Sequence, residues 1–172
     1  MDKIMELWDI LDKEGNKLGK TIKRGEPLAE GEYHLVIDVW IMNNEGKFLI
    51  SRRTPFKHPD PGKWNPVCGS AISGEDSISS ALRETKEELG ISLDIKNGKL
   101  VKRLLCGSKI IVDVWLFTQN VNISTVSLQE EETDDVMWAT AETVKQMIDN
   151  DDFIHPKRVP YVDELFSLYI KI

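Results

Sequence analysis

Stretches of β-prone apolar residues, separated by turn signals, run through most of the chain. The run "YHLVIDVWIM" is followed by the turn "NNEG" and then by "KFLISRR", which predicts a β-hairpin. Two further strands are predicted at "GKLVKRLL" and "KIIVDVWLFTQN", a last short strand at "VMWA", and two extended segments around the turn "DKEGN". Because the strands come in hairpins with few helices between them, the pattern favours an α+β fold with a mixed β-sheet covered by helices.

Three segments have apolar residues at helical spacing. The first begins at Asp76 or Ser77, either of which can cap it, and ends near Leu89, where Gly90 supplies a C-terminal stop. One stripe of this helix carries apolar or methyl-bearing side chains, namely Ile78, Ala81, Leu82, Thr85 and Leu89. "TAETVKQMIDN" predicts a second helix, and residues 160–172 predict a third that docks on the body of the protein.

Length and composition predict one domain over residues 1–172, with an N-terminal β-hairpin and loop over 1–30. The hydrophobic fraction of 41% and the charged fraction of 30% are those of an ordinary globular protein. No apolar run approaches the roughly 20 residues of a membrane span, and "MDKIMELWDI" lacks the core of a signal peptide, so we expect a cytoplasmic protein without a membrane partner. The net charge of -7 argues against a nucleic-acid polymer as partner.

Three carboxylates gather on the first predicted helix. Glu84, Glu87 and Glu88 project together on a side well away from the apolar stripe. A solvated charged face would explain them, but Arg83 is expected to lie off the centre of the cluster and so leaves the repulsion in place. A hard divalent cation, Mg²⁺ or Mn²⁺, removes that repulsion, and the carbonyl of Gly69 in the preceding loop can assist.

The helix and its flanks, "GSAISGEDSISSALRETKEELGI" over residues 69–91, match the spacing G-x5-E-x7-R-E-U-x-E-E-x-G-U, in which U is apolar. Gly69 opens this pattern, Glu75 and Arg83 follow at the required distances, and Thr85 is the one departure because it stands where an apolar residue is usual. The chain therefore resembles the Nudix hydrolase family, for which this pattern is the defining motif, the Nudix box.

The resemblance implies an α/β/α sandwich and the metal-dependent hydrolysis of a diphosphate linkage in a small molecule. It implies Glu84, Glu87 and Glu88 as catalytic residues and metal ligands, with the carbonyl of Gly69 assisting. Arg83 would orient these carboxylates through ion pairs, with Glu75 as a partner. Because members of the family often pair, the resemblance also leaves a homodimer open.

The stretch from Tyr33 to Ser70 also resembles the type 1 isopentenyl-diphosphate isomerases, which are built on the same fold. Cys68 stands where the isomerases carry a catalytic cysteine, and His34 matches one of their metal-binding histidines. Two other expected histidines are replaced by Ser70 and Pro27, and "RLLCGSKIIVDVWLF" lacks the two expected glutamates. An isomerase remains the competing enzyme class, and a silent ligand-binding module is a third reading, but the intact box favours hydrolysis.

The substrate stays open between a nucleoside diphosphate-linked compound and a prenyl-type diphosphate, because residues 105–109 carry no marker of a known substrate subgroup. Arg52 and Arg53 are candidates for contact with phosphate, as are Lys57 and Lys63, and Trp64 is a candidate for stacking on the substrate. The candidates for the general base are carboxylates within the helix and Glu130, Glu131, Glu132 and Asp134, although a flexible acidic surface loop is a slightly better explanation of the latter segment.

Overall fold

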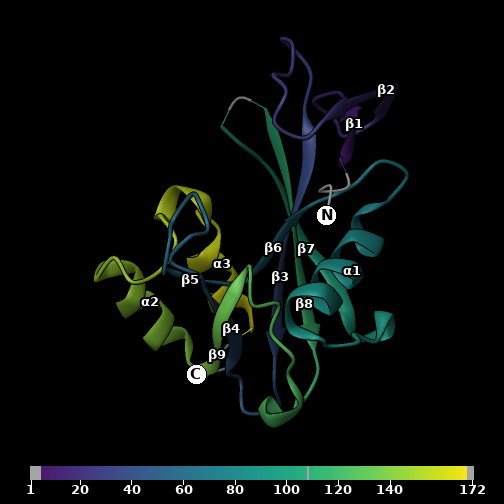
Figure 1. Cartoon of the computed structure of the whole chain (residues 1–172). Helices are drawn as coiled ribbons and strands as arrows, with labels where there is room; N and C mark the ends of the chain where they lie inside the picture. Colours follow the sequence, from purple (N-terminus) through teal and green to yellow (C-terminus); the bar gives the residue numbers. More distant parts are fainter. Residues whose placement is uncertain (1–4, 108, 170–172) are drawn as a thin grey trace.

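The computed structural model describes residues 5–107 and 109–169 of the chain (Figure 1). Its strands are β1 (Leu7–Leu11), β2 (Lys17–Lys23), β3 (His34–Met42), β4 (Phe48–Arg53), β5 (Trp64–Asn65), β6 (Val67–Ser70), β7 (Gly98–Cys106), β8 (Ile110–Thr118) and β9 (Thr133–Ala139). Its helices are α1 (Ser77–Leu89), α2 (Ala141–Asp149) and α3 (Val162–Tyr169), with short 3₁₀ helices at Ile95–Asn97, Ile123–Thr125 and Pro156–Arg158.

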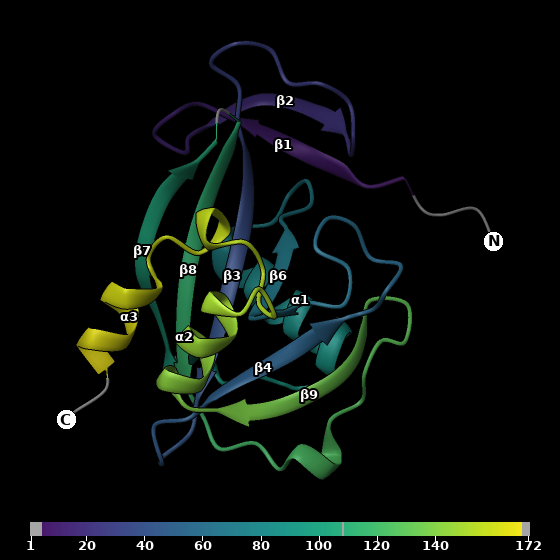
Figure 2. The same ribbon diagram turned by 90° about the vertical axis from the view of Figure 1, so that its left-hand side faces the viewer.

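A seven-stranded mixed sheet forms the centre of the molecule, in the order β5-β4-β3-β8-β7, with β6 on β3 and β9 on β4. β8 runs parallel to β3 along its whole length, so β4 and β6 must share the other edge of β3. β4 pairs with β3 at Ile41 and Met42, and β6 pairs with residues 36–39. The sheet therefore divides along β3, and Figure 2 shows β4 and β9 diverging from it.

Side chains on the two faces of the sheet form two separate cores, as the alternation of strand residues requires. Trp40, Phe48 and Phe166 belong to the core beneath α2 and α3. Ile37, Val39, Leu49 and Phe117 belong to the core beneath α1, together with Ala81 and Leu89 of that helix. Figure 1 shows α1 on one side of the sheet and α2 and α3 on the other, so the expected α+β sandwich is confirmed.

The predicted limits of the box helix are confirmed. Asp76 caps α1 by accepting a hydrogen bond from the Ser79 backbone N–H at 2.9 Å, and Gly90 ends it with φ at 69°. Thr85 is fully buried and donates its hydroxyl hydrogen bond to the Ala81 carbonyl at 2.9 Å, so the hydroxyl is satisfied at a position where apolar residues are usual.

Two sequence expectations differ from the structure. Gly69 lies in strand β6 rather than in a loop. The last helix begins at Val162 instead of 160, and its predicted end at 170–172 lies outside the described residues.

The hairpin of β1 and β2 packs across one end of the central sheet and is attached to the box. The Ser73 N–H donates to the Leu7 carbonyl at 2.7 Å, and Asp9 accepts hydrogen bonds from the Ser73 hydroxyl and the Gly74 N–H, each at 2.9 Å. Burial by itself would raise the pKa of Asp9, but these bonds and the Lys17 ammonium lower it overall. The ionised carboxylate thus fixes the hairpin to the loop that precedes α1.

Replacing Asp9 by Ala should loosen the hairpin without unfolding the sheet. Two hydrogen bonds and an ion pair are lost, so we expect the free energy of opening of β1 and β2 to fall by about 1–3 kcal/mol. Hydrogen exchange measured residue by residue checks this, with β3 and β8 amides as internal reference. Lys13→Ala, an exposed change in the same hairpin turn, is the control, and equal exchange in both variants would contradict the attachment.

Candidate functional site

Strand β6 and helix α1 approach each other closely at two residues of the box, Gly69 and Glu84. A Cβ at Gly69 would lie 2.1 Å from the carboxyl carbon of Glu84 and 2.3 Å from its Oε1. A side chain at this position would displace the Glu84 carboxylate, so glycine is what allows that carboxylate to lie against the strand. The backbone of Gly69 and the carboxylate of Glu84 thereby meet, as the metal-site expectation requires.

Arg83 lies inside the carboxylate cluster, which corrects the expectation that it lies off the centre. Its Nε donates to Glu75 at 2.7 Å, and its Nη1 donates to Glu84 at 2.8 Å and to Glu87 at 3.1 Å. Its Nη2 donates to Glu75 and to the Ser70 carbonyl, each at 3.0 Å. The ion pair with Glu75 that the family resemblance implies is therefore present, and one guanidinium orients three carboxylates.

Glu88 has no such partner. Its side chain is buried, and within the described part of the chain its carboxylate accepts no hydrogen bond and makes no ion pair. Burial and the neighbouring charge of Glu84 raise the pKa of Glu88 to about 8, while the charges of Lys57 and Arg53 act in the opposite direction. Burial likewise raises the pKa of Glu84, against the effect of Arg83.

These carboxylates fit a divalent cation by their chemistry. Carboxylate and carbonyl oxygens are the donors that Mg²⁺ and Mn²⁺ prefer, and a buried carboxylate without a partner is stabilised by a nearby positive charge. Among residues 5–107 and 109–169, no group of three or more His, Cys, Asp or Glu side chains is arranged to hold a metal ion. Glu84 and Glu87 point to Arg83 instead, so ion binding requires these two side chains to turn towards Glu88.

Two basic residues lie beside the cluster. Arg53 is buried, and its Nε donates to the carbonyls of Pro59 at 3.0 Å and Asp60 at 3.2 Å. Lys57 forms an ion pair with Glu132. The charges of Arg53 and Lys57 each lower the pKa of Glu88, which places both near the carboxylates and makes them suitable for binding phosphate oxygens.

Arg52 and Trp64 are not brought to the cluster. Adjacent residues of a strand point to opposite faces, so Arg52 turns away from Arg53. Its guanidinium lies 5.6 Å from the Trp64 ring centroid and pairs with Asp134 at 2.7 Å, while Trp64 packs on the core beneath α2 and α3. Lys63 pairs with Asp151 at 2.7 Å.

The residues shared with the isomerases make different contacts here. The Cys68 thiol donates to Asp38 Oδ1 at 2.7 Å, and the Tyr161 hydroxyl donates to Asp38 Oδ2 at 2.5 Å. Burial and the charge of Asp38 raise the pKa of the Cys68 thiol well above its ordinary value. His34 stacks on Trp8 with ring centroids 4.0 Å apart, and burial lowers its pKa to about 4.

The buried Glu88 predicts an unusual dependence of stability on pH. Its pKa is about 8 in the folded protein and near 4.5 in the unfolded chain, so between these values the folded state binds the extra proton. The free energy of unfolding of metal-free protein should therefore fall as pH rises through this window, by at most about 1.4 kcal/mol per pH unit. Urea unfolding in a chelator measures this slope.

Glu88→Gln should remove most of that slope, whereas the exposed Glu30→Gln should leave it unchanged. A slope that persists in Glu88→Gln would show that Glu88 does not titrate in this window.

Known proteins resemble the chain over nearly its whole length. The Nudix hydrolase lmo0368 of Listeria monocytogenes is 39% identical over 167 residues, covering 95% of each chain. The isopentenyl-diphosphate isomerase of Streptomyces griseus is 34% identical over 85 residues, 49% of this chain and 43% of its own. Among solved structures, DR0079 of Deinococcus radiodurans has a TM-score of 0.75 at 20% identity and covers 96% of this chain and 100% of its own.

A second solved structure, the NUDIX domain of Shewanella oneidensis NrtR complexed with ADP ribose, has a TM-score of 0.64 at 15% identity, covering 86% of this chain and 95% of its own. The model of the NUDIX domain family matches residues 32–162, which include β3, the box and the carboxylate cluster. The chain therefore belongs to the Nudix family and is a Nudix hydrolase, a class of enzyme that acts on pyrophosphate bonds of nucleoside diphosphate derivatives.

Proposed function

We propose that this Nudix hydrolase uses Mg²⁺ or Mn²⁺ to cleave the diphosphate linkage of a nucleoside diphosphate-linked small molecule. Glu84, Glu87 and Glu88 would hold the ion, with the Gly69 carbonyl as a further donor. The observation that carries the proposal is the buried, unpartnered carboxylate of Glu88 beside Glu84, since two like charges in this setting favour a cation between them. A bound divalent ion neutralises phosphate charge and lowers the pKa of bound water.

The protein's own side chains would position the carboxylates, bind phosphate oxygens and accept the proton. Arg83 holds Glu75, Glu84 and Glu87 close together by ion pairs in the metal-free protein, and Glu84 and Glu87 would turn from Arg83 towards a bound ion. Arg53 and Lys57, whose charges act on Glu88, would offer positive charge to phosphate oxygens. In the reaction one water attacks a phosphorus atom, the bridging P–O bond breaks, and a cluster carboxylate accepts the proton, giving two phosphate-containing products.

Substitution of the ligands tests this directly. Glu87→Gln and Glu88→Gln should each lower kcat/KM by roughly 100-fold or more, because loss of a ligand removes several kcal/mol of transition-state stabilisation. The exposed Glu142→Gln on α2 is the matched control. Activity is measured on a panel of diphosphates by phosphate-containing products, with and without chelator.

Three results would contradict the proposal in distinct ways. Full turnover in the presence of chelator would show that the reaction does not require a divalent ion. Conversion of isopentenyl diphosphate to dimethylallyl diphosphate, abolished by Cys68→Ala, would establish the isomerase. Tight binding of a diphosphate without turnover of any compound would establish a ligand-binding module.

A further inference from the structure

A pocket of ≈ 680 Å³ opens beside the carboxylate cluster. Three separate segments line it: Met5, Glu6 and Arg24 from the N-terminal hairpin, Phe56, Lys57 and His58 from the loop after β4, and Gln129, Glu131 and Glu132 from the segment before β9. The presence of the N-terminal hairpin in this wall makes the hairpin a candidate part of the substrate site.

One hydrogen bond and two charge effects relate this pocket to the carboxylate cluster. The Gln129 backbone N–H donates to the Glu88 carbonyl at 3.0 Å, so this wall is attached to the box helix. The charge of Lys57 reaches Glu88, and the charge of Glu6 reaches Glu84 and contributes to the raised pKa of that carboxyl. A diphosphate held at the cluster therefore has its attached group close to the pocket.

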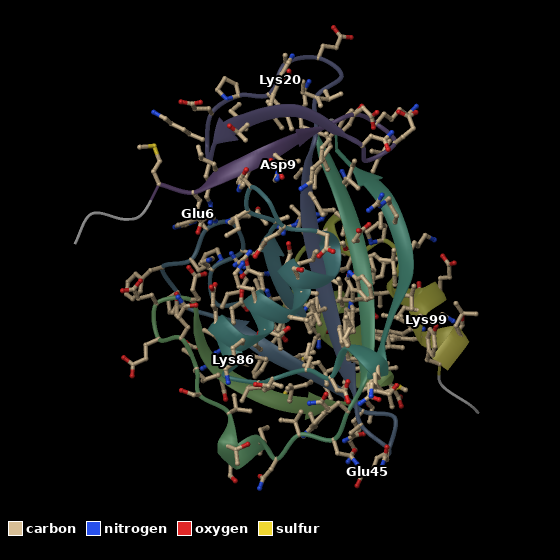
Figure 3. The ribbon with its side chains drawn as sticks, turned by 90° about the vertical axis from the view of Figure 1, so that its right-hand side faces the viewer. Glu6, Asp9, Lys20, Glu45, Lys86 and Lys99 are labelled. Carbon is tan, nitrogen blue, oxygen red and sulfur yellow. The ribbon has the colours of Figure 1, made fainter. Side chains whose placement is uncertain are left out.

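The hairpin presents Arg24 towards the body of the protein. Trp8 and Ile22 pair across the two strands, and Glu6 and Arg24 flank the ends of these strands two positions further on, where the Arg24 N–H donates to the Glu6 carbonyl. Trp8 and Ile22 share one face of the hairpin. This face meets the sheet, because Trp8 stacks on His34 at 4.0 Å with the rings 3° from parallel. In Figure 3 Glu6 lies where the hairpin approaches the body, whereas Lys20 lies on its outer side.

Arg24 is held in place, and among the residues that the structure describes only the Nη1 of its guanidinium has a hydrogen-bond partner. Its backbone N–H donates to the Glu6 carbonyl at 2.9 Å, and its Nη1 donates to Glu6 Oε2 at 2.6 Å. Its side chain remains 54% exposed. A guanidinium has five N–H donors in a fixed plane. A substrate oxyanion can therefore accept from the remaining donors of Arg24 while Glu6 fixes the orientation of the guanidinium.

The chemistry of the wall selects a polar occupant. Arg24, Lys57 and His58 are suited to anionic oxygens, and carboxylates such as Glu6 and Glu131 accept hydrogen bonds from hydroxyl groups. Phe56 is 88% exposed and offers a flat apolar face to a ring. A hydrocarbon chain would bury these charged groups without partners, which is unfavourable.

Resting on the function proposed above, we propose that Arg24 is a specificity-determining residue. Its guanidinium binds an oxyanion on the hairpin side of the substrate, and the pocket thereby favours a hydroxylated, ring-bearing group over a prenyl chain. The N-terminal hairpin thus forms one wall of the substrate site.

The experiment compares two nucleoside diphosphate sugars, ADP-ribose and UDP-glucose, with isopentenyl diphosphate as probes. Loss of a charged hydrogen bond should lower kcat/KM of Arg24→Ala for the hydrolysed sugar by roughly 10- to 100-fold, mainly through KM. Arg24→Lys should recover part of the loss. Lys20→Ala, on the outer side of the same hairpin, should match wild type.

Calorimetric binding of the same probes to Glu88→Gln, with and without Arg24→Ala, gives a second readout that does not need turnover. Weaker sugar binding in the double variant supports the proposal. Unchanged kinetics and binding in Arg24→Ala would overturn the role of Arg24 without contradicting the proposed hydrolysis. Wild-type protein that binds isopentenyl diphosphate more tightly than the nucleoside diphosphate sugars would do the same. Wild type that hydrolyses no diphosphate would instead overturn the proposed function, and calorimetry would still decide the role of Arg24.

Discussion

Electrostatic repulsion within one turn of α1 is the constraint that organises this protein. Glu84, Glu87 and Glu88 are confined there by a helix whose other side is buried against the sheet. Two of them pair with Arg83, and the third, Glu88, is buried and has no hydrogen-bond or ion-pair partner among the residues that the structure describes. An arrangement of this kind is costly in an apoprotein and is relieved when positive charge enters the site, whether as a cation or as a proton.

The rest of the structure serves to hold that arrangement. The absence of a side chain at Gly69 lets Glu84 lie against β6, and β6 pairs only with β3 among the described strands. The core beneath α1 holds the helix against the sheet. Asp9 fixes the N-terminal hairpin to the loop that precedes the helix.

Much of this could be predicted from the sequence where local signals suffice. The cap at Asp76, the stop at Gly90 and the buried stripe of α1 all follow from residue type and helical spacing, and the structure confirms the helix they define. Strand β6 could not be predicted from the sequence, because its four residues lie beside a proline-rich loop and show too little periodicity. Its pairing with β3 is a long-range contact, which local patterns do not reveal.

Site residues that depend on tertiary contacts were harder to place. Arg83 and Glu75 are eight positions apart, and the loop conformation between them decides whether they meet. Arg52 and Arg53 are chemically alike, yet strand alternation sends Arg52 to Trp64 and leaves Arg53 near Glu88. The role proposed for Arg24 has no local signal at all, because the hairpin reaches the box only through the fold.

The most direct measurement is the anomalous diffraction of crystals grown with Mn²⁺ and a diphosphate. The account predicts a manganese peak bounded by the carboxylates of Glu84, Glu87 and Glu88, with the Glu84 and Glu87 side chains turned from Arg83 towards the ion. Clear density for those three side chains in their present ion pairs, with substrate bound and no metal between them, would contradict it.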